Sequence, residues 1–138
     1  MLSNISYNNK TQRDLIDELV GKPYSIRNRL KIGGIGSPKL FVSSCSKEID
    51  SLFVLDNNEN ICNIEIRPKG LILRFRSLLE TYALIIPYYK LNIFKGNSNT
   101  YSIHMEHHKI SIYLNSVNVR KFFKKIQEQK VYSTQDYL

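Results

Sequence analysis

The chain has 138 residues, a length typical of one domain with its own hydrophobic core, and its 42% hydrophobic content excludes an intrinsically disordered protein. Twenty Lys and Arg residues against twelve Asp and Glu residues give a formal net charge of +8, which favours anionic partners without specifying one. The longest apolar run, residues 82–89, is far shorter than the roughly 20 residues of a membrane-spanning helix. No export signal is recognised at the start of the chain, so we expect a soluble, cytoplasmic protein.

The first 38 residues are predicted to form an N-terminal arm. Residues 1–9 are rich in Asn and Ser, which is typical of a frayed terminus. Residues 11–20 then have the apolar spacing of a short helix, and Gly21 and Pro23 end it. The opposite side of this helix is acidic and carries Asp14, Asp17 and Glu18. A helix of this length is not stable alone, so it must dock on the domain or on a partner, and a second copy of the chain is one such partner.

A basic connector is predicted after this helix. Residues 22–47 contain six basic residues and no acidic one, and they include Gly33, Gly34 and Gly36. A glycine-rich turn flanked by cations can bind a phosphate through its backbone amides, but the spacing matches no nucleotide-binding motif. A flexible connector is the simpler interpretation.

Short strands are predicted from residue 39 onward. The first two cover residues 40–45 and 49–55, and residues 56–60 form a turn. A hairpin follows, with strands at residues 61–67 and 71–76. Pairing Ile66 with Leu71 places apolar side chains on one shared face, namely Cys62, Ile64, Ile66, Leu71, Leu73 and Phe75. The other face is then predicted to be solvated and mostly cationic, with Asn63, Glu65, Arg67, Ile72, Arg74 and Arg76.

The least polar part of the sequence, residues 80–94, suggests that the sheet is curved. Residues 82–86 suit a strand buried on both faces, and Pro87 must bend or end it. Residues 91–94 alternate like a half-exposed strand, which predicts a small sheet curling into a barrel or sandwich. Further strands are expected at residues 100–105 and 110–114, joined by a loop at 106–109.

The chain is predicted to end in an amphipathic helix. Asn115 or Ser116 can cap it, and its apolar face is formed by Val119, Phe122, Phe123 and Ile126. Residues 131–138 are expected to be a loose tail. Cys45 and Cys62 stand alone on predicted strands, where small buried thiols are the simpler interpretation and a disulfide is the alternative.

This order of elements resembles a pleckstrin-homology-like (PH-like) domain, a mainly β fold in which about seven antiparallel strands form a barrel and a C-terminal helix fills one open end. The resemblance covers residues 39–130, and the segment from Gly70 to Leu91 is similar to small uncharacterised bacterial proteins of this type. It implies that Phe122, Phe123 and Ile126 close the barrel. Lipid-binding members carry a basic first hairpin, but residues 43–48 offer only Lys47, so we transfer no inositol-phosphate site. Bacterial relatives are more often scaffolds or self-associating modules.

Three groups of residues were considered for chemistry. His104, His107 and His108 lie within five residues and are weak candidates for a metal site, with His104 expected opposite Ser111. No nucleophile motif and no spaced pair of carboxylates is recognised, so we predict no catalytic residues, no cofactor and no enzyme activity. The candidates for binding an anionic partner are Arg67, Lys69, Arg74, Arg76 and Lys90.

From the sequence, we therefore expect a non-catalytic binding or assembly module that acts through protein–protein contacts, including self-association. The alternative is that the basic strand face binds an anionic partner, either an acidic membrane surface or a nucleic acid. An undetected enzyme or a metal-binding protein is a weaker alternative.

Overall fold

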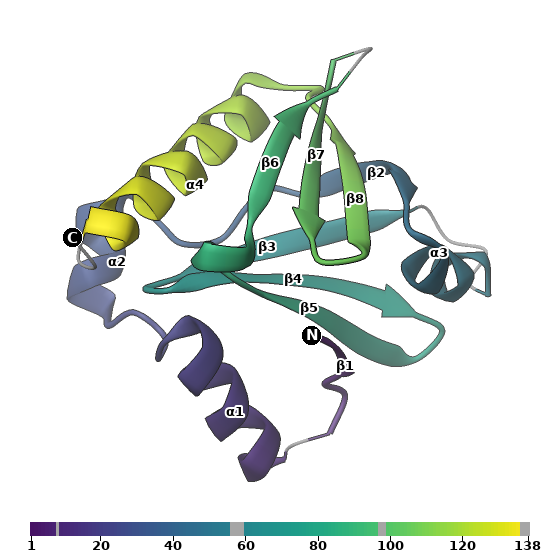
Figure 1. Cartoon of the computed structure of the whole chain (residues 1–138), viewed down its shortest axis with the longest axis horizontal. Helices are drawn as coiled ribbons and strands as arrows, with labels where there is room; N and C mark the ends of the chain where they lie inside the picture. The colour runs from purple at the N-terminus through teal and green to yellow at the C-terminus, as the bar shows by residue number, and fades with distance from the viewer. Residues whose placement is uncertain (8, 56–59, 97–98, 136–138) are drawn as a thin grey trace.

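In the computed structural model, which describes residues 1–7, 9–55, 60–96 and 99–135, one antiparallel sheet contains eight strands in the order β1-β5-β4-β3-β2-β8-β7-β6 (Figure 1). Their bounds are β1 Leu2–Asn4, β2 Leu40–Cys45, β3 Ile61–Arg67, β4 Gly70–Ser77, β5 Glu80–Pro87, β6 Asn92–Lys95, β7 Thr100–Met105 and β8 His108–Tyr113. The helices are α1 Lys10–Val20, α2 Ile26–Ile32, α3 Lys47–Val54 and α4 Val117–Gln135, with a short 3₁₀ turn at Tyr88–Lys90. The predicted mainly β fold with a C-terminal helix is confirmed.

The sheet is strongly bent, and β2 is the strand at which it turns. Leu40 and Phe41 pair with β3, whereas Val42, Ser44 and Cys45 pair with β8, and the register shifts between Val42 and Ser44. Such a bulge bends a strand and increases its twist, so β3–β5 run across β6–β8 at a steep angle (Figure 1). Strands β1 and β6 form the two edges, and the described strands do not close into a complete barrel.

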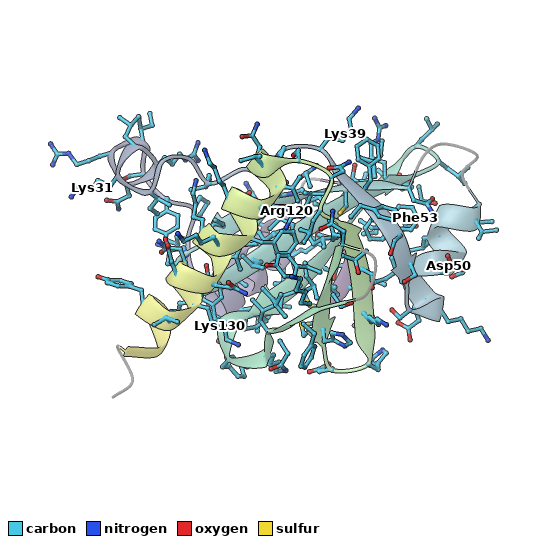
Figure 2. The ribbon with its side chains drawn as sticks, turned by 90° about the horizontal axis from the view of Figure 1, so that it is seen from above. Lys31, Lys39, Asp50, Phe53, Arg120 and Lys130 are labelled. Carbon is cyan, nitrogen blue, oxygen red and sulfur yellow. The ribbon has the colours of Figure 1, made fainter. Side chains whose placement is uncertain are left out.

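The main core lies between the two halves of the sheet, and α4 covers its open side (Figure 2). Val119, Phe122, Phe123 and Ile126 are all buried there, as predicted from their spacing. The Ser116 side chain accepts a hydrogen bond of 3.2 Å from the Val119 amide, so Ser116 caps this helix. The helix extends to Gln135, which corrects the loose tail predicted from residue 131; residues 136–138 lie outside the described part of the chain.

The central hairpin has the predicted register. Ile66 pairs with Leu71, and the six apolar side chains of the predicted inner face all belong to the main core. Strand β5 is buried on both faces from Ala83 to Ile86 and ends at Pro87, also as predicted. The predicted turn at 56–60 falls largely on residues 56–59, which lie outside the described residues.

The N-terminal arm packs on the outer face of the sheet. Ile16 and Val20 of α1 pack against Ile72, Ala83 and Ile85, which forms a second, smaller core. The approach is close at the turn between β3 and β4, where a Cβ atom on Gly70 would lie 2.4 Å from the Ile86 carbonyl oxygen and 2.6 Å from Val20. Only glycine fits there.

Four local predictions about the first half of the chain were wrong. The first residues were predicted to fray, but Leu2–Asn4 form β1, which pairs with β5. Helix α1 begins after Asn9, whose side chain accepts the Gln12 amide, rather than at residue 11. The connector contains α2, capped by Ser25 and ended by Gly33 at φ 84°. Residues 49–55 were predicted to be a strand but lie mostly in α3, because Ile49 and Phe53, four residues apart, are buried on one side of a helix.

No membrane-spanning helix was predicted from the sequence. Among the described residues, no helix combines the length and the apolar composition needed to cross a bilayer.

Candidate functional site

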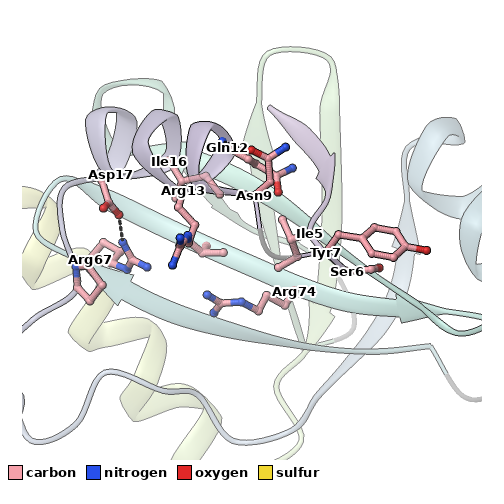
Figure 3. Close-up of a pocket in the computed structure, with 12 residues that line it drawn as sticks. Ile5, Ser6, Tyr7, Asn9, Gln12, Arg13, Ile16, Asp17, Arg67 and Arg74 are labelled. Carbon is pink, nitrogen blue, oxygen red and sulfur yellow. Dashed lines mark hydrogen bonds and ion pairs between the residues drawn. The ribbon is translucent and has the colours of Figure 1, made fainter.

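A cleft of about 580 Å³ lies between α1, the N-terminal segment and the outer face of β3 and β4 (Figure 3). Arginines from three elements line it: Arg13 from α1, Arg67 from β3 and Arg74 from β4. Apolar side chains of Ile16 and Ile72 also line the cleft. The cleft exists because α1 rests on the sheet through Ile16 and Val20 and leaves a space beside this contact.

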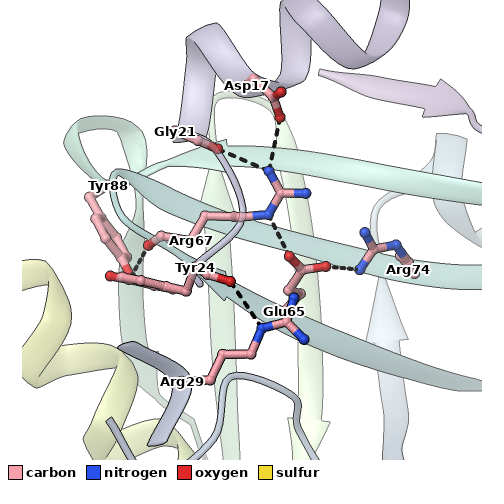
Figure 4. Close-up of polar contacts among 8 residues, drawn as sticks. All are labelled: Asp17, Gly21, Tyr24, Arg29, Glu65, Arg67, Arg74 and Tyr88. Atoms are coloured by element: carbon pink, nitrogen blue, oxygen red, sulfur yellow. Dashed lines mark hydrogen bonds and ion pairs between the residues drawn. The ribbon is translucent and has the colours of Figure 1, made fainter. Parts of the chain in front are cut away.

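The Arg67 side chain is held in place by hydrogen bonds to three residues (Figure 4). Its side chain is 8% exposed, and its Nη1 atom donates to Asp17 Oδ1 at 3.1 Å and to the Gly21 carbonyl oxygen at 2.9 Å. Its Nε atom donates to Glu65. A guanidinium group held in this way joins β3 to both the last turn and the end of α1, so Arg67 positions the arm.

Glu65 connects Arg67 with the next arginine. Arg74 Nη1 lies 2.8 Å from Glu65 Oε1, while the other carboxylate oxygen accepts from Arg67. Burial alone would raise the pKa of the Glu65 carboxyl, but hydrogen bonds and charge from Arg67 and then Arg74 outweigh it and lower that pKa. Glu65 is therefore ionised at neutral pH and holds both guanidinium groups in place.

Arg13 differs from the other two arginines. It is exposed, and its guanidinium group has no hydrogen-bond or ion-pair partner among the residues that the structure describes. Its guanidinium group points into the cleft between Arg67 and Arg74 in the view of Figure 3. Arg13 was not among the residues predicted from the sequence, because the sequence does not show that α1 folds back onto β4.

The predicted anion-binding residues do not form one surface. Arg67 and Arg74 line the same cleft, but Arg76 lies further along β4, exposed and outside it. Lys69 lines a separate groove of about 520 Å³ with Glu18 and Tyr88. Lys90 is paired with Glu106 at 2.7 Å. The structure thus divides the five candidates among four places.

The solvated cationic face predicted for β3 and β4 needs a correction at two positions. Arg67 is only 7% exposed and Ile72 only 1%, because α1 covers both. Alternation along a strand assigns a residue to a face, but it does not show whether another element packs on that face. On the same face, Asn63 and Arg76 are exposed and Glu65 and Arg74 are half-exposed.

The three histidines are also separated. His104 pairs with Lys109, not with Ser111 as predicted, and its ring meets Phe94 edge-on at 5.0 Å. The predicted loop at 106–109 is shorter, because β8 already begins at His108. His107 and His108 have their ring centres 4.1 Å apart.

Glu48 of α3 faces these two rings. His107 Nε2 lies 3.2 Å from Glu48 Oε1, and His108 Nε2 lies 3.9 Å from Glu48 Oε2. His108 is buried, and burial lowers the pKa of its ring, with a further contribution from His107. Glu48 was not selected from the sequence, because residues 49–55 were predicted to be a strand.

A second cationic surface lies over α2 and α4. Lys125 of α4 donates to the carbonyl oxygens of Gly33 and Gly34 at 3.0 and 3.2 Å, which ties the end of α2 to α4. Exposed cations on these helices include Arg27, Arg29, Lys31, Lys121 and Lys124, and Figure 2 shows Lys31 and Arg120 on this side. Ile26 and Leu30 are 77% and 78% exposed among them.

The thiols are unsuited to nucleophilic chemistry. Burial raises the pKa of Cys62 to about 12 and that of Cys45 to about 11, so both are protonated at neutral pH.

Comparisons of the chain with protein-family models, curated proteins and solved structures find no match.

Proposed function

We propose that this chain is a non-catalytic binding module of PH-like architecture. The strand order β5-β4-β3-β2-β8-β7-β6, followed by a helix over the open side of the core, supports this comparison. Strand β1 and helices α1, α2 and α3 are additions to that plan. The thiols are protonated and therefore poor nucleophiles, and Glu65 is ionised and therefore not a proton donor, which supports a binding role over catalysis.

The partner that best fits the arginine cleft is an acidic segment of another protein. The guanidinium group of Arg13 has no partner among the described residues, and Arg67 and Arg74 are already oriented by Glu65. Carboxylates bind guanidinium groups through two parallel hydrogen bonds, and a pre-oriented guanidinium loses less freedom on binding. The single observation that carries the proposal is this convergence of three arginines on one cleft.

The charge of the cleft favours a carboxylate over a polyphosphate chain. Asp17 lines the cleft, and Glu65 is paired with two of its three arginines. These two carboxylates offset much of the positive charge of the arginines, so the local excess of positive charge is small. Asp14 and Glu18 are exposed nearby on α1 and repel a long polyanion. Ile16 and Ile72 add an apolar wall of the kind that a peptide side chain contacts.

The first prediction tests the cleft with Arg13→Ala. The probe is an acetylated peptide of alternating Glu and Leu residues, titrated into ¹⁵N-labelled protein. We expect shifts at the Nε–H groups of Arg13 and Arg74, and a loss of about tenfold in affinity for the variant, because one charge-assisted contact disappears.

Arg76→Ala is the matched control. It removes the same charge from the same side of the sheet but outside the cleft, so we expect its affinity to stay within about twofold of the wild type. Equal losses in both variants, or shifts spread evenly over basic residues, would reject the cleft as the binding site. Tight binding of a nucleic acid instead of the peptide would reject the partner class.

A second candidate function is contact with an anionic membrane surface through α2 and α4. The observation that favours it is the exposure of Ile26 and Leu30 beside Arg27, Arg29 and Lys31, a combination typical of interfacial helices. We expect the protein to sediment with vesicles containing phosphatidylserine and not with phosphatidylcholine vesicles alone.

The double variant Arg27→Ala with Lys31→Ala tests this second candidate. We expect it to abolish most of the sedimentation, whereas Lys39→Ala with Lys95→Ala, which removes two charges elsewhere, retains most of it. Loss of binding in both double variants to the same extent would show a net-charge effect and contradict a defined surface.

Self-association and a cytoplasmic location remain proposals. The acidic side of α1 was considered as the contact with a second copy, but Asp17 is engaged by Arg67 of the same chain, which leaves Asp14 and Glu18 for such a contact. Light scattering over a range of concentrations tests it, and a constant monomer mass would reject self-association.

A further inference from the structure

We propose that Glu48, His107 and His108 form a binding site for a divalent transition-metal ion, joining α3 to the hairpin of β7 and β8. Their candidate ligand atoms all lie within 4.8 Å of one another, and they come from two segments nearly 60 residues apart in the chain. The site is separate from the arginine cleft, because none of its residues lines that cleft.

The backbone holds the two histidines on the same side. Glu106 has a left-handed φ of 56°, and together with His107 it forms the tight turn between Met105 and His108. Neighbouring residues in a regular strand point to opposite faces, but a turn interrupts this alternation. The two rings therefore lie against each other, 4.1 Å apart between centres.

The start of α3 is fixed against the same hairpin. The Ser46 amide donates to the Lys109 carbonyl oxygen at 2.8 Å, and the Lys109 amide donates to the Ser46 hydroxyl at 3.3 Å. These two bonds place the first turn of α3, and with it Glu48, opposite the rings. Ligands positioned by backbone hydrogen bonds need little rearrangement to bind an ion.

The distances suit an ion with short metal–ligand bonds. In a tetrahedral zinc site, bonds of about 2.0–2.1 Å separate the ligand atoms by about 3.3 Å. Here His107 Nε2 lies 3.2 Å from Glu48 Oε1 and His108 Nε2 lies 3.9 Å from Glu48 Oε2, and one ligand atom from each of the three residues lies within 4.8 Å of the others. His107 and Glu48 are 65% and 58% exposed, so rotations of these two exposed side chains can bring all three ligand atoms to one ion.

The donor set selects the class of metal. Two imidazoles and one carboxylate favour Zn²⁺, Co²⁺, Ni²⁺ or Cu²⁺ over Mg²⁺ and Ca²⁺, which prefer oxygen ligands. Three protein ligands leave a coordination position for water, as in sites that exchange their ion or bind a further ligand.

His108 limits the affinity. Its Nδ1 atom is buried and has no hydrogen-bond partner among the described residues. Binding a metal through Nε2 puts the ring proton on Nδ1, where tight zinc sites supply an acceptor. We therefore expect roughly micromolar binding rather than the far tighter binding of structural zinc sites.

Full-length protein without a polyhistidine tag provides the test. Titration calorimetry with zinc chloride at pH 7.5 should give one equivalent at roughly micromolar affinity, and Co²⁺ should produce visible absorption bands with nitrogen and oxygen ligands. Glu48→Gln and His107→Asn change exposed side chains and should each weaken binding by about tenfold or more without lowering the thermal stability of the apoprotein.

His104→Asn is the matched control, because His104 is the third histidine of the same hairpin but lies outside the cluster. We expect it to bind zinc like the wild type. At equal zinc concentration, zinc should also raise the melting temperature of the wild type and of His104→Asn more than that of Glu48→Gln. Absence of stoichiometric binding to the wild type, or an equal loss in His104→Asn, would overturn the proposal. Arg13→Ala should leave zinc binding unchanged, which separates this site from the peptide cleft.

Discussion

At the scale of single residues, Arg67 shows how a strand residue acquires a structural role. Its position in β3 directs it to the outer face, where an arginine is normally solvated. Asp17 and Glu65 instead surround it from two elements, and α1 excludes water from it. The same guanidinium group that lines the cleft thus also fixes the arm.

The prediction at this scale concerns Arg67→Ala. Removing a buried guanidinium leaves Asp17 and the Gly21 carbonyl without their donor, and we expect a loss of about 2–4 kcal/mol in the free energy of unfolding. Urea denaturation measures it. Arg76→Ala, exposed on the neighbouring strand, should stay within about 0.5 kcal/mol, and equal effects of the two variants would contradict the role of Arg67.

Hydrogen exchange adds a more local readout for the same variant. Amides of α1 should exchange faster in Arg67→Ala than in the wild type, whereas those of α4 should keep their order of protection. Uniform acceleration across both helices would show global destabilisation without a specific role in docking the arm.

At the scale of elements, α4 is the helix that the sequence predicts most clearly. Its apolar residues repeat at the spacing of a single helix face, and the opposite side is charged. A helix with this pattern is stable only when its apolar face is covered, and here the two halves of the bent sheet cover it. Phe123 is fully buried and its ring packs against Tyr101 at 5.0 Å.

Phe123→Ala should therefore destabilise the whole fold. Deleting a fully buried ring typically costs about 3–5 kcal/mol, so we expect a large drop in the denaturation midpoint. Phe94→Ala is the matched control, since Phe94 is 57% exposed on β6, and its cost should be below about 1 kcal/mol. A comparable cost for the two phenylalanines would show that α4 does not close the core.

Helix α3 was predicted to be a strand, because a short apolar run does not distinguish a strand from a helix. Ile49, Phe53 and Val54 have high strand propensity, which favours a strand locally. In a strand, Ser51 would share the buried face of Ile49 and Phe53, but Ser51 is exposed, as expected on a helix, and the space beside β2 and β4 receives Ile49 and Phe53. Tertiary packing outweighed the local preference. The same packing brings Glu48 to the histidines.

At the scale of the whole molecule, the bend at β2 and the folding back of α1 create both candidate sites. The bend brings the start of α3 beside the β7–β8 turn, and α1 encloses the arginine cleft. Each site combines residues that are far apart in the chain, such as Arg13 with Arg74 and Glu48 with His107. Spacing along the sequence therefore does not reveal either constellation.

The sequence by itself determined the mainly β class, the register of β3 with β4, the buried strand β5 and the apolar face of α4. These features depend on side-chain periodicity and on the backbone limits of proline, which act within a few residues. The tertiary structure alone decided that Arg67 is buried, that the connector contains a helix and that Glu48 meets two of the three histidines. The reason is physical: burial and ligand geometry depend on which distant segment packs on a face, and a local pattern carries no information about that choice.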